Sequence, residues 1–408
     1  MKFLHAADIH LDSPLAGLHA RGDIPAEIIQ GCTRRAFQAM IDLAIAEDVA
    51  FVVIAGDLYD GDWKDFSTGL FFASQMRRLN RPCFLLRGNH DAQSVITRSL
   101  NRLPDNVHEF SSRTCQSIAL AELGVALHGH SFPNRAVPED LSAGYPAPAK
   151  GLLNIGVLHT SAEDPGGLHD RYAPCTAAAL ALKGYDYWAL GHIHERRVLQ
   201  ERPWIVFPGN LQGRHVQETG AKGCTLVTVE DGRIVAAEHR SVDVLRWALL
   251  EVDATGADLA TLTDRIGRAV TPAIAAADGR PLLARLVVTG ETDLHERLRG
   301  DHEGVAATAR DAADAAGGTL HPETVRIRTR APARGAEERL APLRTAFAAG
   351  LDDPESVAAL LAHLAKLRAG LPPDLQATVE IPLDEAALRA FADDAWALAA
   401  SALEEPRA

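Results

Sequence analysis

The sequence feature that most constrains the fold is an apolar run that ends in a polar loop, and it occurs three times before residue 92. The runs are residues 3–9, 51–55 and 83–86, and each is typical of a buried strand because it is short and bounded by turn residues. Residues 28–47 and 66–79, which separate them, have apolar side chains at helical spacing. This order of strands and helices predicts a parallel sheet, in which ligands bind beyond the carboxyl ends of the strands.

Each of these predicted strands ends in side chains that can bind a divalent metal ion. Asp8 and His10 follow the first strand, Asp57 follows the second and Asn89 follows the third. Because Asp8 and His10 are two residues apart, we expect them to point to the same side of an extended chain. Carboxylate, imidazole and amide oxygen are all metal-ligand types. The sequence therefore predicts a metal site at the edge where the three strands end.

Two later apolar runs end in the same way. Residues 154–158 lead into His159, and residues 187–190 lead through a glycine into His192 and His194. With these histidines the donors are too many for one tetrahedral zinc site, so we expect two ions that share the carboxylate of Asp57. Because the set mixes carboxylate, amide and imidazole without thiolate, manganese or iron is favoured over structural zinc, with magnesium and zinc as further alternatives.

His90 and Asp91 come directly after Asn89 but are not needed as ligands. Two ions about 3.5–4 Å apart clamp a phosphoryl group and activate a water molecule. We expect His90 to contact the phosphate or to protonate the leaving group, and Asp91 to hold the imidazole of His90. His128 and His130 could line the substrate cleft, but we favour a structural role, or a role in supporting the metal ligands, because the metal set is complete without them.

Composition limits the classes of protein that fit this site. The chain has 408 residues, 47% hydrophobic and 23% charged, which is enough for two or three globular domains. A net charge of −13 argues against broad basic patches for nucleic acid, although bound divalent cations would supply local positive charge. The N-terminal residues do not form a basic-then-apolar leader, no apolar run could span a bilayer, and the five cysteines form no CxxC pair. We therefore expect a cytoplasmic protein without membrane contact.

The sequence beyond residue 241 has no cluster of potential metal ligands. Strands are expected at residues 247–252, 282–288 and 324–328, and helices at 258–270 and 305–316. This order of elements predicts a small α+β domain.

The last part of the chain contains a basic run, a linker candidate and two predicted helices. Residues 331–335 are the expected linker, and the helices are expected at 353–369 and after Asp384. We favour packing of these helices on their own domain over docking of a partner. A solvated edge strand is the favoured interpretation of the basic run, with a nucleic-acid or partner contact as the alternative; the run consists of Arg326, Arg328, Arg330 and Arg334.

Five motifs stand in the same order as in the calcineurin-like metallophosphoesterases, and the chain resembles that family. They are Asp8-x-His10, Gly56-Asp57, the run Gly88-Asn89-His90-Asp91, the single His159, and Gly191-His192-x-His194. The resemblance implies that one ion takes Asp8, His10, Asp57 and His194, and that the other takes Asp57, Asn89, His159 and His192. It also implies that His90 is the catalytic histidine.

Three segments resemble one branch of that superfamily more closely. Residues 3–15, 191–196 and 208–223 are similar to the SbcD-like DNA repair exonucleases, in particular to their YhaO-like bacterial members. This resemblance implies a dimanganese nuclease acting on double-stranded DNA ends. It further implies a capping domain and a partner, an SbcC-like coiled-coil ATPase that docks near the C-terminal helices. A homodimer is left open.

We therefore expect a two-metal phosphodiesterase that hydrolyses DNA as an exonuclease in repair. Its expected fold is α/β, with a four-layer α/β/β/α metallophosphoesterase sandwich at residues 1–242. A smaller α+β capping domain is expected at 243–335 and a C-terminal helical region at 336–408. Two alternatives stay open: a phosphoesterase acting on a small nucleotide or a phosphoprotein, and a DNA-end-binding scaffold whose metal site is structural.

Overall fold

The structure is a computed structural model, and it describes residues 1–13, 15, 24–60, 66–92, 103–163, 172–332, 336–372 and 379–404. The chain divides into two compact units. The first comprises Met1–Leu15 and Ala26–Arg246, and the second consists mainly of Trp247–Ala408. The predicted three-domain boundaries, after residues 242 and 335, remain predictions. In the described residues, every helix is too short or too polar to cross a membrane.

The first unit contains two six-stranded sheets. One sheet has the order β12-β11-β1-β2-β3-β4, and the neighbours from β1 to β4 are parallel, as predicted for the first three runs. Its strands are β1 (Lys2–Ala6), β2 (Phe51–Ile54), β3 (Cys83–Leu85), β4 (Val107–Glu109), β11 (Gly223–Glu230) and β12 (Arg233–Ser241). The strands β11 and β12 form an antiparallel pair, which joins this sheet beside β1.

The second sheet has the order β5-β6-β7-β8-β10-β9. Its four inner strands are parallel, whereas β5 and β9 pair antiparallel at the edges. The strands are β5 (Gln116–Leu120), β6 (Val125–Gly129), β7 (Leu153–His159), β8 (Tyr187–Gly191), β9 (Arg197–Glu201) and β10 (Trp204–Phe207).

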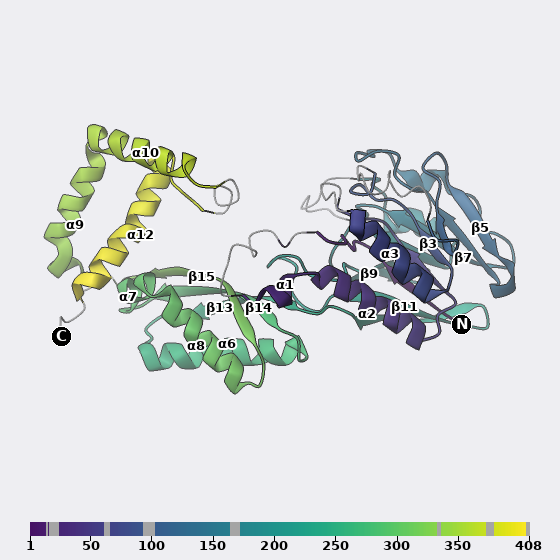
Figure 1. The fold of residues 1–408 in the computed structure, drawn as a ribbon, viewed down its shortest axis with the longest axis horizontal. Coiled ribbons are helices and arrows are strands. Elements are labelled where there is room, and N and C mark those ends of the chain that lie inside the picture. The colour runs from purple at the N-terminus through teal and green to yellow at the C-terminus, as the bar shows by residue number, and fades with distance from the viewer. Residues whose placement is uncertain are drawn as a thin grey trace. The chain divides into compact units, whose positions relative to one another are not determined.

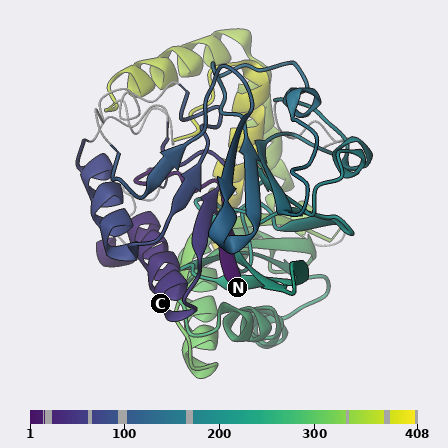
Figure 2. The same ribbon diagram turned by 90° about the vertical axis from the view of Figure 1, so that its right-hand side faces the viewer.

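The two sheets face each other and carry helices on their outer faces. The helices are α1 (Ala26–Ile29), α2 (Cys32–Ala46), α3 (Phe66–Leu79) and α5 (Ala177–Leu182), and two 3₁₀ turns lie at Ala121–Leu123 and Leu141–Gly144. Figure 2 shows α2 and α3 on one side of the strands. The structure confirms the predicted four-layer α/β/β/α fold.

Successive side chains of a strand point to opposite faces of the first sheet, and the apolar side chains on both faces produce two cores. Leu4 and Val52 point outward and pack against Phe37 and Met40 of α2. Phe3, Phe51 and Val53 point inward and meet residues of the second sheet, including Tyr187. A third core under α5 contains Trp188 and Phe207. Burial on both faces explains why these parallel strands appear in the sequence as continuous apolar runs.

Two predicted elements of this unit have different bounds in the structure. The expected strand 3–9 ends at Ala6, because the chain then takes left-handed backbone angles at Asp8 and His10. The expected helix 28–47 is two helices, α1 and α2, since Gly31 between them has a φ of 62°.

The second unit contains a three-stranded sheet covered by helices (Figure 1). The strands are β13 (Arg246–Asp253), β14 (Leu282–Glu291) and β15 (Leu320–Arg330), and β14 and β15 are parallel. The helices are α6 (Leu259–Ala277), α7 (His295–Gly300) and α8 (His302–Ala315). Leu262 and Ile266 of α6 and Ala309 of α8 share the core with Leu286 of β14. The expected helix 258–270 was too short, because α6 continues through Pro272.

Three helices, rather than the expected two, end the described chain. They are α9 (Ala336–Asp352), α10 (Pro354–Ala369) and α12 (Glu385–Glu404). Asp353 caps α10 by accepting a hydrogen bond from the Ser356 amide, as expected from the Asp353-Pro354 pair. α12 contacts α7, and Phe347 of α9 packs on Trp396 of α12. Part of the expected linker, residues 333–335, and Arg334 of the basic run lie outside the described residues.

Candidate metal centre

The predicted metal ligands lie together, at the carboxyl ends of strands from both sheets. Asp8, Asp57 and Asn89 follow β1, β2 and β3, while His159 ends β7. All the predicted ligands are buried except the His194 side chain, which is 20% exposed. The site therefore joins the two sheets at one edge of the sandwich.

Three donors form the first group. The Nε2 atoms of His10 and His194 lie 3.3 Å apart, and His194 Nε2 lies 4.0 Å from Asp8 Oδ1. These three side chains present donor atoms within 4.8 Å of one another, which is compatible with a shared cation.

The second group centres on Asp57 and His159. His159 Nε2 lies 3.4 Å from Asp57 Oδ2 and 2.9 Å from Asn89 Oδ1. Asp57 Oδ2 also lies 3.9 Å from His10 Nε2 of the first group. The Asp57 carboxylate thus stands between the two groups, in the position predicted for a bridging ligand. The His192 ring lies beside His159, with ring centroids 5.3 Å apart.

Several of these residues have unusual backbone conformations. Asp8, His10, Asp57 and His192 have φ values of 50°, 43°, 51° and 104°. The side chains of Asp8 and His10 converge as expected. The backbone that brings them together is left-handed, however, and not the expected extended chain. Such left-handed angles cost free energy in residues with a Cβ, and they concentrate at functional sites.

The glycines of the motifs allow the two sheets to approach closely. A Cβ on Gly88 would overlap the Asp57 carboxylate, and one on Gly56 would overlap the His159 ring. A Cβ on Gly191 would overlap the carbonyl oxygen of Ala55. Glycine is therefore required sterically at these positions.

Hydrogen bonds behind the site fix the orientation of two histidine rings. His159 Nδ1 donates to the carbonyl oxygen of Ala55 at 2.9 Å, and His194 Nδ1 donates to Glu218 Oε1 at 2.6 Å. In both rings Nε2 consequently faces the cluster, where it can bind an ion once it has lost its proton. Metal-binding histidines have this arrangement, with the second nitrogen held by a carbonyl or carboxylate group. The residues present therefore fit a pair of divalent ions.

His90 lies beside this cluster, and its partner is Asp60. Its Nδ1 is 3.1 Å from Asp60 Oδ1, its ring packs edge-on against His10, and its side chain is 34% exposed. His90 is thus close to the donors and open to a ligand.

The expectation that Asp91 holds the His90 ring was wrong. The Asp91 side chain turns into the interior, where its carboxylate accepts hydrogen bonds from the amides of Leu58, Tyr59 and Gly88. Asp91 therefore fixes the loops that carry Asp57 and Asn89. Asp60 and Glu218 had not been predicted, and only their places in the motif loops could have indicated them.

Burial and mutual charge govern the protonation of the cluster. Burial lowers the pKa of His159, but the Asp57 carboxylate outweighs that effect and raises it to about 9. Burial would raise the pKa of Asp57, yet the neighbouring His159 and His10 hold it well below its usual range. Burial, assisted by the Asp57 charge, raises the pKa of Asp91 to about 7. The centre is thus an electrostatically coupled, buried set of acids and bases.

His128, which had been assigned a structural role, is buried in the second sheet. Its Nδ1 lies 2.8 Å from Ser117 Oγ and its Nε2 lies 3.1 Å from Asn154 Oδ1, and its ring stacks on Tyr185. These contacts support the structural role for His128.

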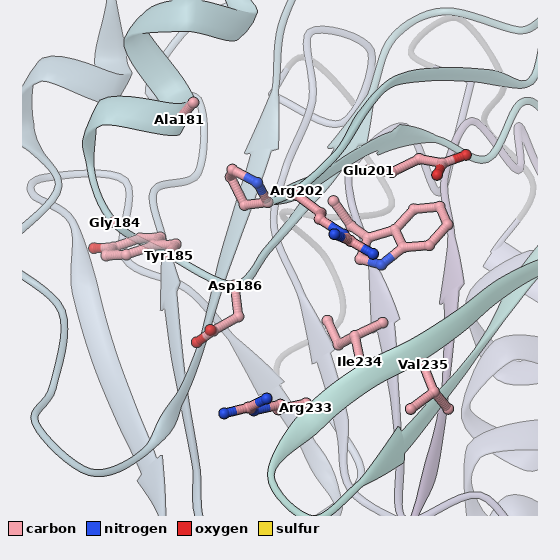
Figure 3. Close-up of a pocket in the computed structure, with 11 residues that line it drawn as sticks. Ala181, Gly184, Tyr185, Asp186, Glu201, Arg202, Arg233, Ile234 and Val235 are labelled. Atoms are coloured by element: carbon pink, nitrogen blue, oxygen red, sulfur yellow. The ribbon is translucent and has the colours of Figure 1, made fainter.

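A separate pocket of about 490 Å³ opens at the other ends of the strands (Figure 3). Tyr185 and Asp186, which precede β8, line it together with Trp204 at the start of β10 and Arg233 at the start of β12. None of the predicted ligands lines this pocket, so it is distinct from the metal centre.

Comparison with known proteins defines the class of the chain. Residues 1–196 match the calcineurin-like phosphoesterase family. The chain is 38% identical over 299 residues to a protein of Bacillus subtilis (strain 168) described as uncharacterized metallophosphoesterase YhaO, covering 71% of this chain and 72% of that protein. The chain therefore belongs to the calcineurin-like metallophosphoesterases, hydrolases that bind divalent ions in a dinuclear site.

More specific similarities point in the same direction. Residues 247–330 match the family of the middle domain of metallophosphoesterase YhaO. The chain is also 26% identical to the DNA double-strand break repair protein Mre11 of Sulfurisphaera tokodaii, over 60% of this chain and 63% of that protein, which is less than two thirds of its length. A dimetal phosphatase from Danio rerio is 12% identical, with a TM-score of 0.39 over 59% of this chain and 96% of that one, too weak a likeness to support a conclusion.

Proposed function

We propose that the chain is a cytoplasmic two-metal phosphodiesterase that hydrolyses DNA, as an exonuclease in repair. The observation that carries this proposal is the convergence of carboxylate, amide and imidazole donors on both sides of Asp57, with the partly exposed His90 beside them. In the proposed assignment, one ion is bound by Asp8, His10, Asp57 and His194, and the other by Asp57, Asn89, His159 and His192. Manganese is our first choice of metal.

The proposed mechanism divides the work between the ions and the protein. Bound ions would supply a water-derived nucleophile and offset charge on the phosphoryl oxygens. His90 Nε2 would donate a proton to the leaving oxygen, because Asp60 holds the ring through Nδ1 and the ring is partly open to ligand. Asp60 is a positioning residue in this scheme, and Asp91 supports the loops.

DNA is the proposed substrate for two reasons. The relative from Sulfurisphaera tokodaii is described as a DNA double-strand break repair protein. The chain also carries a second unit with a sheet, whereas a small diester needs only the metal centre. A phosphoesterase acting on a small nucleotide or a phosphoprotein is the alternative.

We also propose that an SbcC-like coiled-coil ATPase binds the C-terminal helices. Apolar side chains that α9 and α10 leave exposed support this proposal, since exposed apolar clusters are typical of interaction surfaces. They include Leu343, which is 52% exposed, and Leu367, which is 58% exposed.

The decisive test compares wild type with His90→Gln. Release of nucleotides from linear duplex DNA in Mn²⁺ would be measured, together with turnover of bis(p-nitrophenyl) phosphate and metal content by mass spectrometry. We expect wild type alone to digest DNA, with turnover in His90→Gln reduced about 100- to 10,000-fold and its metal content unchanged. Turnover of the small diester without DNA digestion would favour the alternative substrate. No turnover of either would favour the scaffold.

A further inference from the structure

Arg214 lies in the loop after β10, at the rim of the metal centre. Its side chain is 16% exposed, and its Nη1 lies 3.3 Å from Ser13 Oγ and 3.8 Å from Asp60 Oδ2. Its Nη2 lies 3.6 Å from Glu218 Oε1. The guanidinium therefore stands between the carboxylate that orients His90 and the carboxylate that orients His194.

The N–H groups of this guanidinium make few hydrogen bonds to the described residues. Arg214 Nε is buried and has no hydrogen-bond partner among the described residues. Neither carboxylate is within 3.5 Å of its nitrogens. The nearby His194 Nδ1, at 3.4 Å, cannot accept a hydrogen bond, because it donates to Glu218. One long bond to Ser13 is the remaining contact of hydrogen-bond length in the described part of the chain.

Two other buried or half-buried arginines of this unit are fully engaged. Arg246 donates from Nε to Asp243 at 2.9 Å, and Arg34 donates from Nε to both oxygens of Asp12, at 2.7 and 2.9 Å. Burying a cation without such a partner costs free energy.

Arg87, Arg196 and Arg240 also have a buried Nε without a partner among the described residues, but Arg87 pairs with Glu109, Arg196 donates to the Ala237 carbonyl at 2.9 Å, and Arg240 is 41% exposed. The Arg214 side chain is 16% exposed and has no hydrogen bond shorter than 3.3 Å to the described residues. This shortage of partners at the edge of a candidate active site suggests that an anionic ligand completes its hydrogen bonding.

The carboxylates near Arg214 are already occupied. Asp60 binds His90 and accepts a 2.7 Å hydrogen bond from Ser13, and Glu218 binds His194 and accepts from Asn210 and from the Arg214 amide. These carboxylates offset the charge of the guanidinium without accepting hydrogen bonds from its N–H groups. Its N–H groups thus lie beside His194 and beside Asp60, the partner of His90, with no carboxylate oxygen of the described residues within 3.5 Å.

We propose that Arg214 binds the non-bridging oxygens of the substrate's phosphoryl group. The inference rests on the proposed phosphodiesterase function and adds a substrate-binding residue to it. A planar guanidinium matches two oxygens of a phosphoryl group, and it would hold that group while His90 protonates the leaving oxygen.

Binding of inorganic phosphate to the full-length, Mn²⁺-loaded protein tests the proposal. Calorimetry would give the dissociation constant for wild type, Arg214→Gln, Arg214→Lys and the control Arg78→Gln, and metal content would be measured on each. Arg78 is a suitable control because it pairs with Asp42 on the outer helices. We expect phosphate to bind Arg214→Gln about 10- to 100-fold more weakly and Arg214→Lys to an intermediate degree, with two ions retained and the control unchanged.

Two results would overturn the proposal. If Arg214→Gln bound phosphate as tightly as wild type while losing turnover, Arg214 would be a positioning residue for His90. If both Arg214 variants lost a metal ion, the arginine would instead maintain the Glu218–His194 contact. The calorimetric result does not depend on turnover. A wild type that binds phosphate through Arg214 but cleaves no phosphodiester would therefore contradict the proposed function alone.

Discussion

Replacement of Glu218 by glutamine tests whether a carboxylate behind the metal centre controls the affinity of one ion. Glu218 is 6% exposed, and its Oε1 lies 2.6 Å from His194 Nδ1. Its other oxygen accepts hydrogen bonds from Asn210 Nδ2 at 2.9 Å and from the Arg214 amide at 2.7 Å. Glutamine has the same shape but only one accepting oxygen.

In Glu218→Gln the single accepting oxygen can face either His194 or the pair of donors from Asn210 and Arg214, but not both. If it continues to accept from Asn210 and Arg214, the amide nitrogen faces His194 Nδ1, and two donors oppose each other. The imidazole can relieve this clash by moving its proton to Nε2, the nitrogen that points toward Asp8 and His10. A protonated Nε2 cannot bind a metal ion.

The expected magnitude follows from this loss of orientation. Changes to residues that hold a metal-binding histidine cost about 10- to 100-fold in metal affinity, or about 1.4–2.7 kcal/mol. We expect this loss for the ion bound by His194 and little change for the ion bound by His159, whose ring is held by Ala55 instead.

Calorimetric titration of the metal-free protein with Mn²⁺ would resolve the two affinities. Glu195→Gln is the matched control, since Glu195 is adjacent to His194 in sequence but is 70% exposed and pairs with Arg197. Equal affinity of both ions for Glu218→Gln and wild type would refute the reasoning, and so would an equal loss at both sites.

Three further predictions concern the bridge, the motif glycines and a buried histidine. Asp57→Asn should lose both ions, and two ions per chain by mass spectrometry would contradict the bridging assignment. Gly88→Ala should displace the Asp57 carboxylate and reduce metal content, whereas Gly267→Ala, within α6 and with open space around its Cβ, should keep the metal and add about 0.5–1 kcal/mol of stability. Burial lowers the pKa of His5 from 6.5 to about 3, so its contribution to stability is complete above pH 6.5 and falls by about 1.4 kcal/mol per pH unit below it. Urea unfolding of the metal-free protein between pH 7.5 and 5.5 should therefore show a shallower pH dependence for His5→Gln, and equal slopes would contradict this.

The sequence predicted the metal donors well because each follows a buried parallel strand. The strands containing Val53, Phe84 and Ala189 appear in the sequence as continuous apolar runs, and their ends fall at one edge of the sandwich. Once the strands are recognised, the positions of the donors are set by the topology of the sheets. The left-handed backbone at Asp8 and His10 was missed, since periodicity does not report φ.

The sequence failed where a partner comes from a distant loop. Asp91 was chosen as the partner of His90 because it is adjacent in sequence, but adjacent residues need not point to the same side of a turn. The partner is Asp60, 30 residues away, and the His194 partner Glu218 is 24 residues away. In α9, Pro342 and a weak apolar stripe conceal a helix that tertiary packing, including the contact of Phe347 with Trp396, supports.

These successes and failures divide the site into two layers with different origins. The donors stand at the ends of strands such as β2 and β7, whose positions two packed cores determine. Asp60, Arg214 and Glu218 stand on loops, which tolerate change more readily than the strands that they connect. A chain of this fold can therefore keep the same metal ligands while its loops change. Changes in the loops alter which residues bind the phosphoryl group and which residue is positioned to donate a proton. It follows that variants of the loop residues should test the proposed choice between DNA and a small diester, because variants of the metal donors are expected to abolish turnover of either substrate.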